Sequence, residues 1–170
     1  MWEKIVAVDI ETTPIDPITK DIEKIWCICS AWRDLDGSIK TDAITFPGGI
    51  TKHDLTLYRD ERLIELQEIF DNDCDVVPSF HNALFEYRHL TESGFRIKRF
   101  HDSQVLGYIL CPALQRFSLE AWGERGYCDV KIHGDVDVNT FFSEYSEEIV
   151  DRCLGDVRST LQLTERLIKE

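Results

Sequence analysis

Three apolar runs near the start of the chain predict strands. Residues 4–10 form a continuous β-branched run, which is typical of a central strand buried on both faces. Two shorter runs follow over residues 24–32 and 39–46, and Asp36-Gly37 between them marks a tight turn. Together the three runs predict a three-stranded antiparallel meander at the start of a sheet.

Helical spacing dominates the rest of the chain. Residues 60–72 place four apolar side chains on one helical face, namely Leu63, Leu66, Ile69 and Phe70. Further helices are predicted over residues 82–92, from 102 to about 110, over 118–124 and from Ser146 onward, with short strands over 74–80 and 95–100. The last helix has Ser146 as its N-cap. Its core stripe is Ile149, Cys153, Val157, Leu161 and Ile168.

This order of elements predicts an α/β domain. Its mixed sheet would combine the three antiparallel strands with the short ones, in parallel, and helices would flank it. The chain contains no repeat, low-complexity tract or linker, so we expect a single domain over residues 1–170.

Composition narrows the class of protein. Hydrophobic residues make up 43% and charged residues 30% of the 170, which is globular composition. No apolar run approaches the roughly 20 residues that span a bilayer, and Asp9 interrupts the first run too early for a signal peptide. We therefore expect a soluble intracellular domain without a membrane partner.

The net charge of −13 argues against a broad basic face that holds long nucleic acid by counterion release. A nucleic-acid enzyme remains open, because clustered carboxylates can ligate metal ions. A solvated acidic surface would account for most of the excess charge. The six cysteines, at positions 27, 29, 74, 111, 128 and 153, form no C-x-x-C pair, which favours buried free thiols over a zinc site or disulfides.

Asp9 and Glu11 are the first candidates for chemistry. Residues two apart in a strand point to the same face, so both carboxylates would project together from the end of the first strand. Their repulsion would call for a hard divalent cation such as Mg²⁺ or Mn²⁺. The spacing equally allows a strand that emerges into solvent, with Glu11 capping a turn.

Two further acids lie on predicted helices. Glu86 follows a strand-to-helix turn and is flanked by Phe85. Asp156 lies on the last helix, where Arg152, four residues earlier, shares its face. Taken alone, each acid also fits an exposed helical position.

Several motifs occur in order along the chain. They are Asp9-Ile-Glu11-Thr12-Thr13, His81-Asn82-Ala-Leu-Phe85-Glu86, His101-Asp102-Ser-Gln-Val-Leu, Ser118-Leu-Glu-Ala-Trp-Gly123 and Tyr145-Ser-Glu-Glu followed by Arg152-Cys-Leu-Gly-Asp156-Val157. With them the chain resembles, over almost its whole length, the 3′–5′ proofreading exonucleases of the DEDD superfamily, which have an RNase H-like fold. The nearest likeness is to the exonuclease domain of phage-type family A DNA polymerases.

The resemblance implies two-metal hydrolysis of phosphodiester bonds, with two Mg²⁺ or Mn²⁺ ions. The implied metal ligands are Asp9, Glu11, Glu86 and Asp156. Thr12 and Thr13 would hold the terminal nucleotide. Asn82 would brace the helix start or the site, Phe85 would be a core side chain or a base-stacking wedge, and His81 would be structural.

Two positions depart from the family pattern. Glu86 stands where the family usually has Asp, and its extra methylene would loosen the metal geometry. Arg152 stands where the family has Tyr or His, which orients or deprotonates the attacking water. An arginine cannot act as a base at pH 7, but it can grip the scissile phosphate or neutralise Asp156. We therefore expect reduced activity rather than none, with Arg152 counted among the catalytic residues.

The first hypothesis is a metal-dependent 3′–5′ exonuclease that acts on single-stranded DNA ends in the cytoplasm of a bacterial or phage-infected cell. Because no polymerase sequence follows Glu170, it would act alone or as the separate proofreading part of a split polymerase, and the acidic charge favours such a partner. The alternatives are a weak or inactive module that binds a polymerase or another protein, and an RNA-processing exonuclease.

Overall fold

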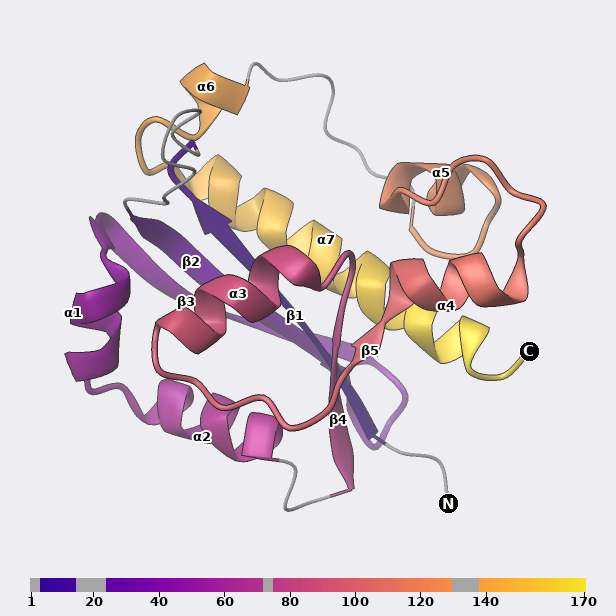
Figure 1. The fold of residues 1–170 in the computed structure, drawn as a ribbon, viewed down its shortest axis with the longest axis horizontal. Coiled ribbons are helices and arrows are strands. Elements are labelled where there is room, and N and C mark those ends of the chain that lie inside the picture. Colours follow the sequence, from indigo (N-terminus) through magenta and orange to yellow (C-terminus); the bar gives the residue numbers. More distant parts are fainter. Residues whose placement is uncertain (1–3, 15–23, 72–74, 130–137) are drawn as a thin grey trace.

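A computed structural model describes residues 4–14, 24–71, 75–129 and 138–170. Its strands form one five-stranded sheet in the order β3-β2-β1-β4-β5 (Figure 1). The strands are β1 (Lys4–Thr12), β2 (Ile25–Arg33), β3 (Ile39–Ile50), β4 (Val76–Phe80) and β5 (His101–Asp102). β2 pairs antiparallel with β1 and β3, whereas β4 pairs parallel with β1 and β5. The predicted meander and the mixed sheet are confirmed.

Helices flank the sheet on both faces. They are α1 (Lys52–Leu57), α2 (Glu61–Asp71), α3 (Leu84–Glu92), α4 (Ser103–Leu110), α5 (Leu119–Glu124), α6 (Val138–Phe141) and α7 (Glu147–Leu167). The helix α1 was not predicted; its signal is Thr51, whose hydroxyl accepts the backbone N–H of Asp54 as an N-cap. Asn72 and Cys74, which ended one predicted helix and began one predicted strand, lie outside the described residues.

The prediction of a strand over residues 95–100 is wrong, because this segment bonds to helices instead of to a neighbouring strand. The backbone N–H of Phe95 donates to Leu90 O, and that of Lys98 donates to Phe70 O. The N–H of Arg96 donates to the side chain of Gln67. Alternating burial of Phe95 and Ile97 imitates a strand, but the ladder begins only at His101.

The two faces of β1 bury different helices. Val6, Val8 and Ile10 pack in a cluster with residues of α1, α2 and α3, whereas Ala7 packs in the cluster of α7. Figure 1 shows α7 crossing one face of the sheet while α1, α2 and α3 cover the other. The position of α7 decides the site, because Asp9 and Glu11 share the face of Ala7.

The helix α7 begins as predicted, with the Ser146 side chain accepting the backbone N–H of Ile149. The predicted stripe is buried except at its end, where Leu167 rather than Ile168 enters the core. Ile168 is the C-cap residue that follows the last helical residue, and the apolar cluster around Phe117 and Trp122 receives Leu167.

The cysteines of the described residues are free thiols. Cys27, Cys29 and Cys153 are buried, as predicted, but Cys111 and Cys128 are only half-buried. Among the helices of the described ranges, none is long and apolar enough to cross a membrane.

Candidate active site

Asp9 and Glu11 lie near the carboxyl end of β1, on the face that α7 covers. In the antiparallel register they stand opposite Cys29 and Cys27 of β2. Asp9, Glu11 and Cys153 of α7 bring one ligand atom each to within 4.8 Å of one another. The two carboxylates therefore share a face, and they meet a packed helix rather than open solvent.

Glu86 reaches Asp9 from the first turn of α3. Its side chain is only 6% exposed, and it is hydrogen-bonded to the carboxylate of Asp9. Its second oxygen, Oε2, is buried without a hydrogen-bond partner among the described residues. A buried acceptor of this kind is costly unless a ligand or an ordered water satisfies it.

The turn before α3 sets the direction of Glu86. Asn82 has a φ of 65°, a left-handed conformation that Asn tolerates better than most residues. The carboxylate of Asp102 accepts the backbone N–H groups of Asn82 at 3.2 Å and Ala83 at 2.9 Å. The same carboxylate also caps α4 by accepting the N–H groups of Gln104 and Val105. Asp102 thus ties the starts of α3 and α4 together.

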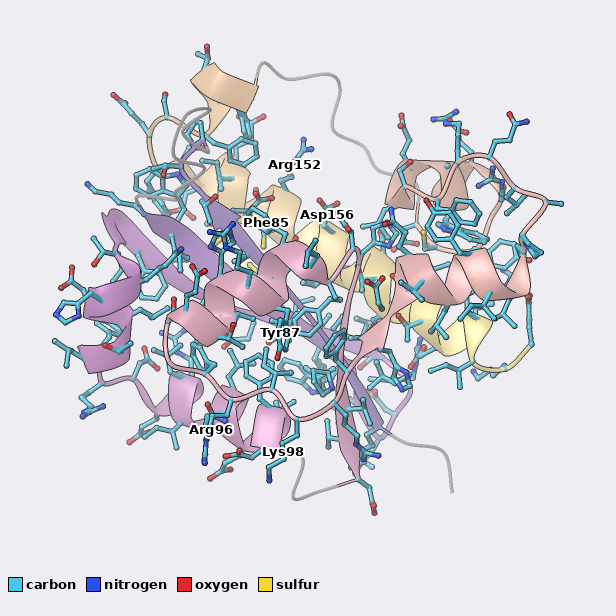
Figure 2. The ribbon with its side chains drawn as sticks, viewed as in Figure 1. Phe85, Tyr87, Arg96, Lys98, Arg152 and Asp156 are labelled. Carbon is cyan, nitrogen blue, oxygen red and sulfur yellow. The ribbon has the colours of Figure 1, made fainter. Side chains whose placement is uncertain are left out.

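Asp156 completes the group from the middle of α7. Figure 2 shows it one turn after Arg152 on this helix. Its negative charge raises the pKa of both Asp9 and Glu11, which places it close to these two acids. The structure therefore brings together all four carboxylates that the motifs single out.

The electrostatics of this cluster favour the binding of a cation. Burial, followed by the charge of Asp156, raises the pKa of Asp9 to about 7. Burial and then the charge of Asp9 raise the pKa of Glu86 to about 10. The same two causes hold the pKa of Glu11 well above its usual range. A divalent ion would relieve this repulsion, and the unpartnered Glu86 Oε2 with the other carboxylate oxygens offers the donors that Mg²⁺ and Mn²⁺ prefer.

Arg152 lies beside the cluster. Its guanidinium carbon is 5.9 Å from the centroid of the Phe142 ring, and its charge lowers the pKa of Glu11. The side chain is half-buried. Arg152 therefore sits at the edge of the carboxylate group.

The side chains that were predicted to contact the substrate make contacts within the fold. The hydroxyl of Thr12 donates to Thr13 O at 2.9 Å, and that of Thr13 accepts the backbone N–H of Lys24. Phe85 packs against the core cluster and against the ring of His89, at 4.7 Å between centroids, which favours its reading as a core side chain. The role of both threonines in binding a nucleotide stays a prediction.

His81 and Asn82 occupy the turn between β4 and α3. The Nδ1 atom of His81 shares a 2.8 Å hydrogen bond with Ser103 Oγ, a structural contact between the turn and α4. Asn82 is exposed and supplies the left-handed residue of the turn. Its conformation fits bracing of the helix start, one of the two alternatives that the sequence left open.

Sequence reasoning missed the roles of Asp102 and Cys153. For Asp102 the signal was present, since an Asp directly before an apolar helix is a typical N-cap. Its second function, on the turn before α3, depends on a contact across 20 residues of sequence. Cys153 donates to Asp9 Oδ2 at 3.7 Å across 144 residues, and nothing in its local sequence indicates this contact.

No protein-family model matches the chain, and no curated protein matches it. Solved structures do. Brucella melitensis NrnC superposes with a TM-score of 0.68 and 17% identity, over 97% of this chain and 72% of that one, and it is also described with bound Mg²⁺ and bound to pGG. The chain has an RNase H-like fold.

Other solved nucleases agree with this fold. Exonuclease X, in complex with a 5′-overhanging duplex DNA, superposes with a TM-score of 0.57 and 16% identity over 97% of this chain and 91% of that one. The Trypanosoma brucei RNase D complex with RNA U12 gives a TM-score of 0.55 and 17% identity over 98% and 56%. The structural neighbours are DEDD-type exonucleases, the superfamily that the motifs resemble. At these identities the likeness establishes the fold.

Proposed function

We propose that this chain is a divalent-metal-dependent 3′–5′ exonuclease that hydrolyses phosphodiester bonds at the 3′ ends of single-stranded DNA. The observation that carries the proposal is the meeting of Asp9, Glu11, Glu86 and Asp156, which come from β1, α3 and α7. The orphaned Oε2 of Glu86 and the raised pKa of Asp9 support it, because both are relieved by a bound cation.

In this proposal the four acids hold two Mg²⁺ or Mn²⁺ ions. When bound, the ions supply an activated water and stabilise the leaving 3′ oxygen. Asp9 and Glu11 enter the site as carboxylates from a rigid central strand. Glu86 gives up the proton that it otherwise shares with Asp9. Arg152 donates hydrogen bonds to the phosphate, a role that suits a fixed guanidinium charge.

The fold and the charge both bear on the proposed substrate. The neighbours include one complex with duplex DNA that carries a 5′ overhang and one with RNA U12. A chain with net charge −13 would hold only the terminal nucleotides, at the acids and Arg152, rather than a long strand. We place single-stranded DNA first, with RNA as the alternative substrate of the same site.

Proofreading beside a separate polymerase fits the same reasoning. Such a partner, of the phage type that the motifs resemble, would deliver the 3′ end and provide the DNA affinity that an acidic surface lacks. The protein would then act in the cytoplasm, where replication of bacterial or phage DNA takes place.

The test is a gel assay with 5′-labelled single strands of DNA and RNA of one sequence, each with Mg²⁺, Mn²⁺ or EDTA. We expect a ladder that shortens from the 3′ end with either metal and full-length strands with EDTA. Faster cleavage of the RNA strand would mean that RNA is the preferred substrate, and the proposed reaction would be unchanged. The double variant Asp9→Ala and Glu11→Ala should fold and cleave nothing; equal cleavage by this variant would place the reaction elsewhere.

One observation favours a second candidate, a weak or inactive module that binds a partner protein. Arg152 supplies a permanent charge beside Glu11, where relatives have a Tyr or His that handles water. It could therefore occupy the site in place of a productive water. Full-length strands in every lane of the gel would favour this candidate over the exonuclease.

A further inference from the structure

Three sulfur atoms meet behind the carboxylates. Cys27 and Cys29 lie two apart on β2 and so point to the same face of the sheet, where α7 supplies Cys153. All three side chains are 0% exposed, and their sulfurs lie within 4.8 Å of one another. Buried thiols are usually inert small hydrophobes, but a cluster of three offers three soft ligands to a single ion.

The spacing of the sulfurs suits a thiophilic metal. Two thiolates that each stand about 2.3 Å from a zinc ion, at the tetrahedral angle, are about 3.8 Å apart. The sulfurs of Cys27 and Cys29 are 3.9 Å apart. Their rotamers therefore need little change to bind one ion, with Cys153 as the third ligand.

Cys153 connects this cluster to the proposed nuclease site. Its Sγ lies 3.7 Å from Asp9 Oδ2, and it also belongs to the group formed with Asp9 and Glu11. An ion caught first by the two carboxylates would pass inward past Cys153 to the three thiols. The two groups of three ligand atoms share Cys153, so a movement of the Asp9 carboxylate toward the thiols would supply the fourth ligand of a tetrahedral set.

We propose that Cys27, Cys29 and Cys153 form a site for a thiophilic metal ion such as Zn²⁺ or Cd²⁺. Binding displaces the three thiol protons to solvent and draws the carboxylate of Asp9 toward the thiol side. The loaded site then competes for Asp9 with the ions of hydrolysis, so a thiophilic metal inhibits the nuclease. The inhibition rests on the proposed function, whereas the binding site does not.

The binding site is tested with Co²⁺ added to the reduced full-length protein under anaerobic conditions. Thiolate ligation gives a thiolate-to-cobalt charge-transfer band in the near ultraviolet, and bound Co²⁺ is then displaced by Zn²⁺. We expect this band in the parent and in the control Cys128→Ala, a half-buried thiol outside the cluster. Cys29→Ala loses one of the three thiolates, so we expect its affinity for Co²⁺ to be lower by at least about tenfold.

Alanine is chosen at Cys29 because, unlike serine, it places no hydroxyl in the buried cluster. Circular dichroism checks that the variant folds. Cys27→Ala is the second variant if Cys29→Ala does not fold. A folded parent without the band overturns the site, as does a band of equal strength and affinity in the folded variant.

The inhibition is tested separately with Mg²⁺-driven cleavage and added Cd²⁺. The parent should lose activity at a Cd²⁺ concentration at least about tenfold below that needed for Cys29→Ala, in line with the loss of one ligand. Equal inhibition of both proteins would mean that Cd²⁺ inhibits through the carboxylates alone, and it would overturn the proposed coupling between the thiol site and Asp9. If the parent shows the cobalt band but cleaves no substrate, the proposed function fails while the thiol site stands.

Discussion

Asp9, Glu11 and Glu86 hold their protons more tightly than exposed carboxyls do, and this sets the response of the metal-free protein to pH. The folded pKa is raised from 3.8 to about 7 for Asp9 and from 4.5 to about 10 for Glu86. The folded state therefore binds more protons than the unfolded chain above about pH 4. Stability contributed by these acids is present below that pH and is lost as pH rises toward and through 7.

We expect the melting temperature in EDTA to fall between pH 5 and pH 8. Carboxyls whose pKa is lowered titrate below this pH window. Glu92 is an example, because hydrogen bonds from Lys52 and Arg88 lower its pKa to about 2. Asp9→Asn should flatten the fall, and Mg²⁺ should restore the melting temperature at pH 8. A metal-free melting temperature that rises between pH 5 and pH 8 would contradict the shifted pKa values.

The exchange Arg152→Tyr tests the departure from the family motif. A tyrosine at this position can orient the attacking water, whereas a guanidinium cannot accept its proton. We expect the rate of cleavage to increase by about tenfold, below the range of full general-base catalysis. Arg152→Gln is the control, which removes the charge without supplying a phenol. A faster Gln variant would mean that the charge of Arg152 inhibits the parent, and a slower Tyr variant would mean that the phosphate contact of Arg152 contributes more to the rate than an oriented water does.

The sequence predicted which acids meet, because the order of the three motifs that carry them is itself informative. It left open how they meet. The pKa of Asp9 depends on burial under α7 and on Asp156, which is 147 residues away in sequence. The placement of Arg152 over Phe142 depends likewise on a packed neighbour that no local pattern indicates.

At the scale of elements, Asp102 is the residue outside the four site carboxylates whose replacement should most affect stability and the site. Asp102→Asn replaces one accepting oxygen by an NH₂ group, so the turn before α3 or the cap of α4 loses hydrogen bonds to a charged acceptor. We expect a loss of about 2 kcal/mol in the free energy of unfolding. At about 2–4 °C per kcal/mol, the melting temperature should fall by several degrees.

A purely structural role would change stability alone. Because Asp102 holds the turn that aims Glu86, the variant should also need more Mg²⁺ for half-maximal cleavage. Asp151→Asn, an exposed acid on α7, is the matched control. If the variant melts earlier but keeps the parental Mg²⁺ dependence, Asp102 supports the fold without positioning Glu86.

Most elements followed from local patterns, and two of the failures share a cause. The segment over residues 95–100 alternates like a strand, yet its N–H groups bond to α2 and α3. The two-residue strand β5 is too short to leave a pattern of its own. In both cases a tertiary partner, rather than the local sequence, decides the hydrogen bonding.

For the whole molecule, the acidic surface limits how much nucleic acid the protein can hold by charge. Each phosphate contact with a single strand adds about 0.7 to the slope of log affinity against log salt. With Arg152 as the cation at the site, we expect a slope that corresponds to about one to three phosphates. The measurement is the KM for a single-stranded oligonucleotide across a series of salt concentrations. A slope several times steeper would reveal a long basic track and contradict the end-binding account.

The central claim is that four acids from three elements act together on a divalent metal. It is tested most directly by comparing Mg²⁺-driven cleavage by Asp156→Asn and Asp151→Asn, two acids five residues apart on α7. We expect Asp156→Asn to lose more than about a hundredfold in rate, beyond the usual loss of an outer metal partner, and Asp151→Asn to match the parent. Equal rates for the two folded variants would contradict the assignment of the site.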